Sequence, residues 1–434
     1  MRPMGKRIFI IMVLLGGICS SQPASAQFTL RDAQLYAVER NKYLQAKNLV
    51  VKKIESELFN AGLLTPFNPE LEIEKDSDIL TARSGEGSLQ LSLNQEFELG
   101  AQRGKRLDIA RARIEEASLE ALTFRERLMI DVRYAHSTLI AAQKKVENAK
   151  YAEDLAKSLR DTAYVRYRNS FIPFSEYTFL NIDYILMAKA RSEAEVSLTN
   201  AASQFGILLG SPEDQFIGAS GALSITPLSV SNEALLALAL KSRYEISGSN
   251  LSRKISDLEL ALAKRDRIPN LKLSAFYLRD ISVFNRDNLT GSVPGFEKLS
   301  DTDNLFGLRV TIPLPLINRH RSEITGLKLQ GELIDTLLQG LTQRIKFEVL
   351  TSYQNLSRAE DNLRLFEGVL PDADSVLYLL QAAYSEGRIK LDDYLFQKDR
   401  LLSIRADFVD AYLEYAGARR ALEQAVGLEW DSIR

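Results

Sequence analysis

Two pairs of short segments in this chain alternate between hydrophobic and polar side chains. The segments are Leu71–Glu74, Leu89–Leu99, 271–277 and 306–312. A period of two is typical of β-strands, because successive side chains of a strand point to opposite faces. The pattern predicts two β-hairpins, at about 70–99 and 270–315, with strands of about 9 to 11 residues.

One face of these predicted strands is apolar and the other is polar. The polar positions are Glu72, Glu74, Gln90, Ser92, Asn94, Glu96, Lys272, Ser274, Arg309 and Thr311. A half-buried sheet of a soluble protein has the same alternation, so the pattern alone does not predict a membrane-spanning sheet. A sheet with open edges is not stable in lipid, so strands that span a membrane would have to be shared by several chains.

A very long helical hairpin follows each predicted β-hairpin, at about 101–209 and 318–427. Residues 101–168 contain no proline, which permits a single helix of about 100 Å. Small or apolar residues recur at every seventh position from Leu107 to Ala163 and from Ile324 to Leu380. This period predicts left-handed coiling, and Pro371 is expected to interrupt or kink the second long helix. An ordinary antiparallel coiled coil fits the same period.

The two halves of the chain are copies of one unit. Residues 167–210 align with 384–427 without a gap. The opening segments align at a smaller offset, which places Ala33 on Ala234 and Tyr43 on Tyr244. The chain is therefore expected to be a duplicated unit of helix, strand, strand and long helical hairpin.

Each copy is predicted to open with one helix. These helices run from about Leu30 to Leu64 and from about Asn232 to Arg267, with Thr29 and Asn232 as N-caps. The predicted organisation is a first repeat at 27–210, a connecting segment at 211–231 and a second repeat at 232–434.

The N-terminal segment predicts export. Basic residues precede an apolar run, Ile8–Ile18, that is too short to span a bilayer, and Ala24-Ser25-Ala26 matches a signal-peptidase site. Residues 1–26 are therefore predicted to be a signal peptide. In a lipoprotein Cys19 would be acylated, but Ile18 is bulky where a small residue is needed.

Composition argues against several classes of function. The net charge is −2, which gives no general attraction to nucleic acid, and Cys19 is the one cysteine. His136 and His320 have no second histidine at ligand spacing. Gly100–Lys105 is one residue short of a phosphate-binding loop and precedes Arg106. We expect neither an enzyme nor a cofactor.

The whole pattern resembles the TolC-like outer membrane factors of Gram-negative tripartite efflux and secretion systems. The resemblance extends from Phe28 to Gly427 and rests on the duplicated architecture. The segments Ala61-Gly62-Leu63-Leu64 and Asn68-Pro69-Glu70-Leu71 are most similar to the branch associated with heavy-metal cation efflux.

The resemblance implies a mainly α-helical fold with a membrane β-barrel portion. Three identical chains would each contribute four strands to one 12-stranded barrel in outer membrane lipid, with the ten polar residues above facing its lumen. Their helices would form a tunnel across the periplasm. The implied partners are a periplasmic adaptor protein and an inner-membrane pump of the RND type. The implied function is passive export of metal cations or small toxic compounds.

The resemblance also implies roles for the turns of the two helical hairpins. The adaptor-docking residues would be Asn169, Ser170, Phe171, Ile172, Pro173, Glu386, Gly387, Arg388, Ile389 and Lys390. The family's aperture positions correspond to Ser175, Glu176 and Tyr384, while its aperture arginine falls on Ile389. An altered latch would use Arg388 or Lys390 with Asp392 and Asp393, although solvated helix ends carry such charges equally well.

Two other classes of function remain open from the residues alone. A periplasmic coiled-coil scaffold or adaptor without a pore of its own would have the same seven-residue period. A secreted hydrolase would need paired carboxylates on rigid strands in a concave site.

Overall fold

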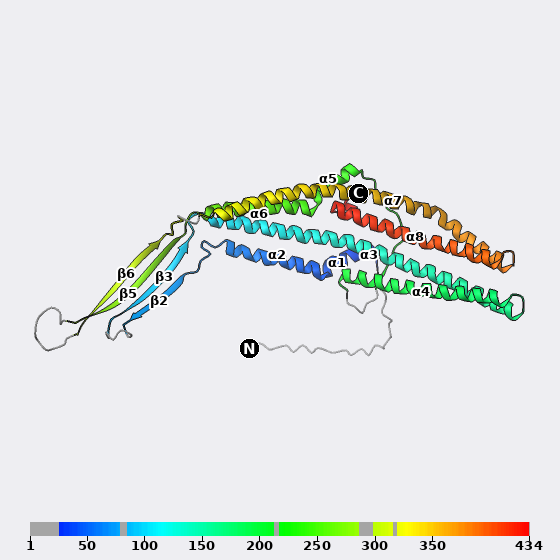
Figure 1. The fold of residues 1–434 in the computed structure, drawn as a ribbon, viewed down its shortest axis with the longest axis horizontal. Helices are drawn as coiled ribbons and strands as arrows, with labels where there is room; N and C mark the ends of the chain where they lie inside the picture. Colours follow the sequence, from blue (N-terminus) through cyan, green and yellow to red (C-terminus); the bar gives the residue numbers. More distant parts are fainter. Residues whose placement is uncertain (1–25, 79–84, 212–216, 286–297, 316–318, 434) are drawn as a thin grey trace, which may run out of the picture.

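The computed structural model describes residues 26–78, 85–211, 217–285, 298–315 and 319–433. The molecule is elongated, with a β-sheet at one end and the turns of two long helical hairpins at the other (Figure 1). Apart from Ala26, the predicted signal peptide lies outside the described residues.

The elements of the two copies follow the same order along the chain. The first copy contains β1 (Ala26–Phe28), α1 (Leu30–Arg40), α2 (Lys42–Ala61), β2 (Glu70–Ser77), β3 (Gly87–Phe97), α3 (Gln102–Arg168) and α4 (Phe174–Leu209). β4 (Ile217–Ala219) lies in the connecting segment, and the second copy contains α5 (Asn232–Ser242), α6 (Tyr244–Arg265), β5 (Leu271–Asn285), β6 (Lys298–Thr311), α7 (Arg321–Ser385), α8 (Leu391–Val426) and α9 (Trp430–Ile433).

The helices α3 and α7, with 67 and 65 residues, run the length of the helical body. Toward the sheet they lie beside α2 and α6, and toward the turns they lie beside α4 and α8 (Figure 1). The positions of the seven-residue period, from Leu107 to Ala163 and from Ile324 to Leu380, are buried or partly buried. Pro371 does not end α7, which continues through it.

The opening helices differ from the prediction, because each is broken into two. Asn41 has an extended backbone that ends α1, and its side chain accepts a hydrogen bond from the amide of Leu44 to begin α2. Arg243 has the same conformation between α5 and α6. The break lets α1 and α5 turn away from the axis of the helix that follows, while the apolar spacing continues through it.

The alignment of the opening segments also needs a correction of one residue. Thr29 caps α1 as predicted, but α5 is capped by Ser231 rather than Asn232. The buried Ala33 of α1 corresponds to the buried Leu235 of α5, and not to Ala234. Burial therefore identifies equivalent positions in the two copies more accurately than side-chain similarity does.

Two short strands that the alternation pattern did not reveal form a second sheet. β1 and β4 pair in parallel, with Phe28 opposite Ala219. At three residues each they are too short to show a period of two. They tie the start of the first copy to the segment that connects the copies.

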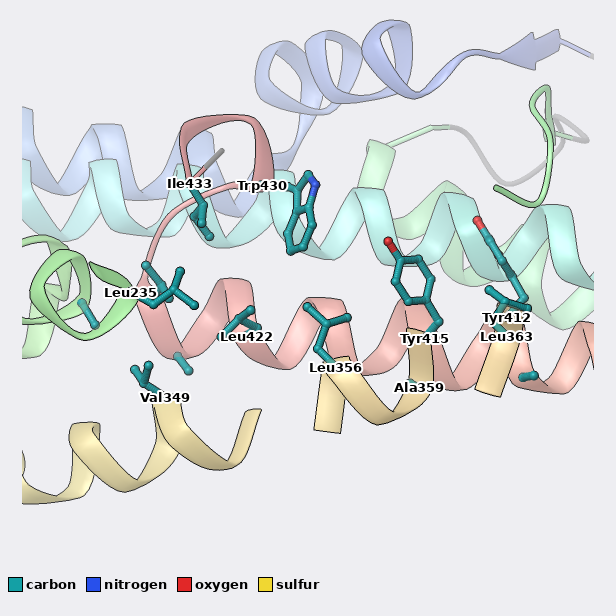
Figure 2. Close-up of a cluster of buried hydrophobic side chains, with 14 of the residues drawn as sticks. Leu235, Val349, Leu356, Ala359, Leu363, Tyr412, Tyr415, Leu422, Trp430 and Ile433 are labelled. Atoms are coloured by element: carbon teal, nitrogen blue, oxygen red, sulfur yellow. The ribbon is translucent and has the colours of Figure 1, made fainter. Parts of the chain in front are cut away.

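The largest hydrophobic core lies where α5, α7 and α8 meet (Figure 2). Leu235 of α5, Val349 of α7 and Leu422 of α8 are fully buried there. The hydroxyl of Tyr415 accepts from the amide of Thr226 and donates to its carbonyl oxygen, which anchors the connecting segment to α8. Because α9 folds back onto α8, Trp430 adds its ring to this core.

The main sheet has the strand order β2-β3-β5-β6, and all its pairs are antiparallel. The two predicted hairpins therefore join into one sheet through β3 and β5. β5 and β6, with 15 and 14 residues, are longer than the predicted strands. The sheet projects from the end of the helical body, away from the helices (Figure 1).

Candidate membrane and gating sites

The strand register gathers all the predicted polar positions on one face of the main sheet. Glu72 lies opposite Ser92 in the neighbouring strand, and the same alternation continues across β5 to β6. The ten residues on this face are Glu72, Glu74, Gln90, Ser92, Asn94, Glu96, Lys272, Ser274, Arg309 and Thr311. The sheet thus has one mainly polar face, which also carries Phe276 and Leu278, and one mainly apolar face.

On the two central strands the polar face is partly buried, while the outer residues Glu72, Glu74, Arg309 and Thr311 are exposed. The apolar face is open, with Leu71, Phe306 and Leu308 exposed by 69%, 79% and 77%. On the polar face Ser92 and Ser274 are only 2% and 4% exposed. An apolar face of this extent without a cover is expected only where another apolar medium or another chain covers it.

Phe276 explains part of the burial on the polar face. Its ring lies over Gly307 of the next strand, where any side chain would collide with it. The guanidinium of Arg309 stacks on the same ring, 5.1 Å from its centroid. Arg309 lies opposite the buried Ser274 in the strand register.

Both outer edges of the main sheet lack a strand neighbour among the described residues. β2 pairs only with β3, and β6 pairs only with β5. Unpaired strand edges are sites for pairing with another chain. Within the same described ranges, no helix combines the length and apolar content required to cross a bilayer.

The turns at the opposite end of the molecule have closely related geometry. Two residues after the end of α3, Ser170 has φ 60°, and two residues after the end of α7, Gly387 has φ 71°. In both turns an amide bonds to a carbonyl five residues earlier: Phe171 to Arg166, and Arg388 to Ala383. This is the Schellman arrangement that satisfies the last carbonyls of a helix.

The two turns differ in the side chains that they present. On the first, Phe171 is 75% exposed and lies near a group of aromatic rings that includes Tyr167 and Phe174. On the second, Arg388 forms an ion pair with Glu386 at 2.7 Å, and both side chains are exposed. Of the other predicted docking residues, Asn169, Pro173 and Lys390 are exposed, while Ile172 and Ile389 are partly buried.

The structure brings together two of the three predicted aperture residues. The hydroxyl of Tyr384 donates to Oε1 of Glu176 at 2.8 Å, which joins α7 of the second copy to α4 of the first. Burial of Tyr384, together with its hydrogen bond to Glu176, raises the pKa of the phenol. The hydroxyl therefore stays protonated and donates at physiological pH. Ser175 is exposed and takes no part in this contact within the chain.

The altered latch is not assembled within one chain. Asp392 and Asp393 are exposed, and Arg388 pairs with Glu386 rather than with either of them. Ile389 packs instead against the hydrophobic cluster below the tips, which includes Leu380 and Tyr394.

Sequence reasoning missed a buried ion pair below the helical tips. Lys398 of α8 contacts Asp183 of α4, and both are buried. The signal was present, since Lys398 follows the buried Tyr394 by four residues and so occupies an apolar position on the helix.

An exposed apolar sheet at one end of long, paired helical hairpins is the architecture that the resemblance to outer membrane factors implies. Residues 235–428 match the family described as outer membrane efflux protein. The match confirms the resemblance predicted from the sequence and the outer membrane as the location of the chain.

A particular relative and two solved structures are similar to nearly the whole chain. The cobalt-zinc-cadmium resistance protein CzcC of Cupriavidus metallidurans is 21% identical over 406 residues, covering 93% of this chain and 91% of CzcC. The CmeC outer membrane channel of Campylobacter jejuni superposes with a TM-score of 0.72 at 14% identity, covering 97% and 94%. CusC superposes with a TM-score of 0.70 at 14% identity, covering 95% and 96%. The shared fold is that of channel proteins.

Proposed function

We propose that this protein is the exit duct of a tripartite efflux system and conducts its substrate passively across the outer membrane. The observation that carries the proposal is the main sheet, whose apolar face is exposed while its polar face is partly buried. Lipid would cover the apolar face, and the polar face would line a water-filled passage. Such a passage lowers the free energy of moving polar solutes through lipid, so no reactive centre is needed.

The unpaired edges support a homotrimer. If β6 of one chain pairs with β2 of the next, three chains with four strands each close a 12-stranded barrel without open edges. Apolar side chains exposed on the long helices support the same association, among them Ile185 of α4 and Leu337 of α7, exposed by 55% and 62%. The helices of the three chains would form a tunnel in the periplasm.

The polar face of the main sheet would form the lumen of the barrel. Its acidic members Glu72 and Glu74 would attract cations into the lumen. The similarity to CzcC, named for cobalt, zinc and cadmium resistance, supports metal cations as substrates. Small toxic compounds are the second substrate class that we propose. In either case the energy for export would come from an inner-membrane pump of the RND type.

The helical tips would form the periplasmic aperture and the docking site for an adaptor protein. In this proposal the contact between Tyr384 and Glu176 keeps the tip closed, and the residues of the two turns bind the adaptor. Adaptor binding would shift the population toward an open tip, without any catalysis.

Conductance in planar lipid bilayers tests this function. We expect the wild-type protein to conduct weakly and Tyr384→Phe to conduct more, because the variant keeps the ring but loses the hydrogen bond to Glu176. Tyr378→Phe is the matched control, since Tyr378 lies on the same helix and is 72% exposed. A wild-type protein and a Tyr384→Phe variant that both fail to conduct would instead support the scaffold without a pore.

A further inference from the structure

A buried ion pair joins the two copies below the helical tips. Nζ of Lys398 on α8 lies 2.6 Å from both carboxylate oxygens of Asp183 on α4. The lysine side chain is 1% exposed and that of the aspartate 9%. A second carboxylate, that of Asp399, lies 3.3 Å from Nζ but is itself exposed. The contact between Lys398 and Asp183 therefore depends on how the two hairpins lie against each other.

The pair belongs to the same inter-copy contact as the proposed aperture. Asp183 follows Glu176 by two helical turns on α4. On the facing helices, the ring of Tyr384 stacks on the fully buried Tyr394 with centroids 4.8 Å apart, and Lys398 lies one turn further along α8. The contacts thus run from the tip inward as a hydrogen bond, an aromatic stack and an ion pair.

A dry ion pair and an apolar contact respond differently when two helices separate. Burying the pair removes hydration from both charges, and their attraction offsets this only while they stay together. When the helices part, each charge regains its hydration, so separation adds little penalty. Apolar side chains of similar size would pack as well, but separation would expose their surface to water. An ion pair therefore fixes the position of the two helices relative to each other in the closed state and still permits the helices to separate.

We propose that Lys398 and Asp183 form a releasable brace of the closed tip. While the contact is dry, the brace holds α8 of the second copy in register with α4 of the first. When the tip opens, water enters and hydrates both charges, and the hairpins separate. Both are positioning residues, since they act on the aperture through α4 and α8. The inference rests on the proposed channel function and adds a second layer to its gate.

Single-channel recordings of the full-length protein in planar bilayers test the brace. Lys398→Met leaves Asp183 buried without its cation, and hydration of that charge then favours the open tip. We expect an open probability about tenfold higher or more. Lys398→Met combined with Asp183→Leu replaces the pair with an apolar contact, and we expect an open probability at or below that of the wild type. A merely structural pair would change both variants in the same direction.

Three further variants keep the test decisive. Asp183→Asn leaves Lys398 with only the exposed carboxylate of Asp399 and changes the shape little, so it replaces Lys398→Met if that variant does not assemble, with the same expected rise. Tyr384→Phe shows that the recordings respond to an opened tip. Lys189→Met removes one positive charge from an exposed pair on α4 and should have no effect.

Two results would overturn the brace. One is wild-type conductance in the single variants while Tyr384→Phe conducts more, and the other is equal opening in the single and double variants. Neither result affects the proposed channel function. Absence of conductance in the wild type and in every variant would overturn the channel itself and the brace with it.

Discussion

At the scale of single residues, the two copies satisfy one backbone requirement with different side chains. In both copies the turn after the long helix contains a residue with positive φ, which is Ser170 in the first copy and Gly387 in the second. A side chain in this left-handed conformation is unfavourable by about 1 kcal/mol relative to glycine. The first turn therefore carries backbone strain that the second avoids, although both have the same hydrogen bonds.

Replacing Ser170 with glycine should stabilise the protein. We expect Ser170→Gly to raise the free energy of unfolding by about 1 kcal/mol, and the reciprocal Gly387→Ala to lower it by about the same amount. Thermal unfolding of the purified protein, followed by circular dichroism, measures both. Equal midpoints for Ser170→Gly and wild type would contradict the strain assigned to this turn.

A second residue-scale feature is the buried cluster around Glu423. Burial raises the pKa of Glu423 to about 7, although Arg133 and Arg419 lie close and lower it. The amide of Trp430, the one tryptophan in the chain, donates to this carboxylate at 2.9 Å. The guanidinium of Arg419 lies 4.3 Å from the centroid of the indole ring and 3.9 Å from the same carboxylate, so Arg419 connects the ring to a group that changes its charge near neutral pH.

The fluorescence of Trp430 should follow the protonation of Glu423. We expect a transition near pH 7 in the wild type and none in Glu423→Gln, which cannot titrate. Because the folded pKa lies above the unfolded value of 4.5, this group stabilises the fold fully below pH 4.5. That contribution, about 3 kcal/mol, is lost as the pH rises through 7. A pH-dependent emission that persists in Glu423→Gln would assign the transition to another group.

At the scale of elements, the long periodic segments could be predicted from the sequence and the short breaks could not. A seven-residue period over α3 and α7 and a period of two over the main sheet each extend across many residues. The break at Asn41 depends on one side chain that caps α2, within an apolar pattern that continues unbroken. Only the fold reveals that this asparagine interrupts the helix.

The candidate gate could also be predicted from the sequence only in part. Family resemblance located Glu176 and Tyr384, and the structure joins them by a hydrogen bond. The altered latch and the brace depend on which charges meet across copies, and Lys398 has no sequence neighbour that identifies Asp183 as its partner. Contacts between segments so far apart in the chain follow from the packing of the hairpins and not from local pattern.

The two faces of the main sheet should respond oppositely to an added charge. Leu308→Arg places a cation on the apolar face, which in lipid costs about 2 to 4 kcal/mol near the middle of the bilayer. We therefore expect less folded protein in the outer membrane fraction. Gln90→Arg adds the same charge to the polar face and is the matched control. Equal amounts of the two variants in that fraction would mean that the apolar face does not contact lipid.

At the scale of the whole molecule, a single chain leaves large apolar surfaces open. Among the described residues, both outer edges of the main sheet are unpaired, its apolar face is exposed, and the long helices leave apolar side chains uncovered. Each of these features destabilises a chain that remains alone in water. Association with further copies in lipid would satisfy all of them together.

The most direct test of this account is the mass of the folded protein extracted from the outer membrane in detergent, measured by native mass spectrometry. We expect three copies of the chain, dissociating into single chains on heating, and we expect extraction to require detergent. A folded single chain released into aqueous buffer from the periplasm would contradict the shared pore.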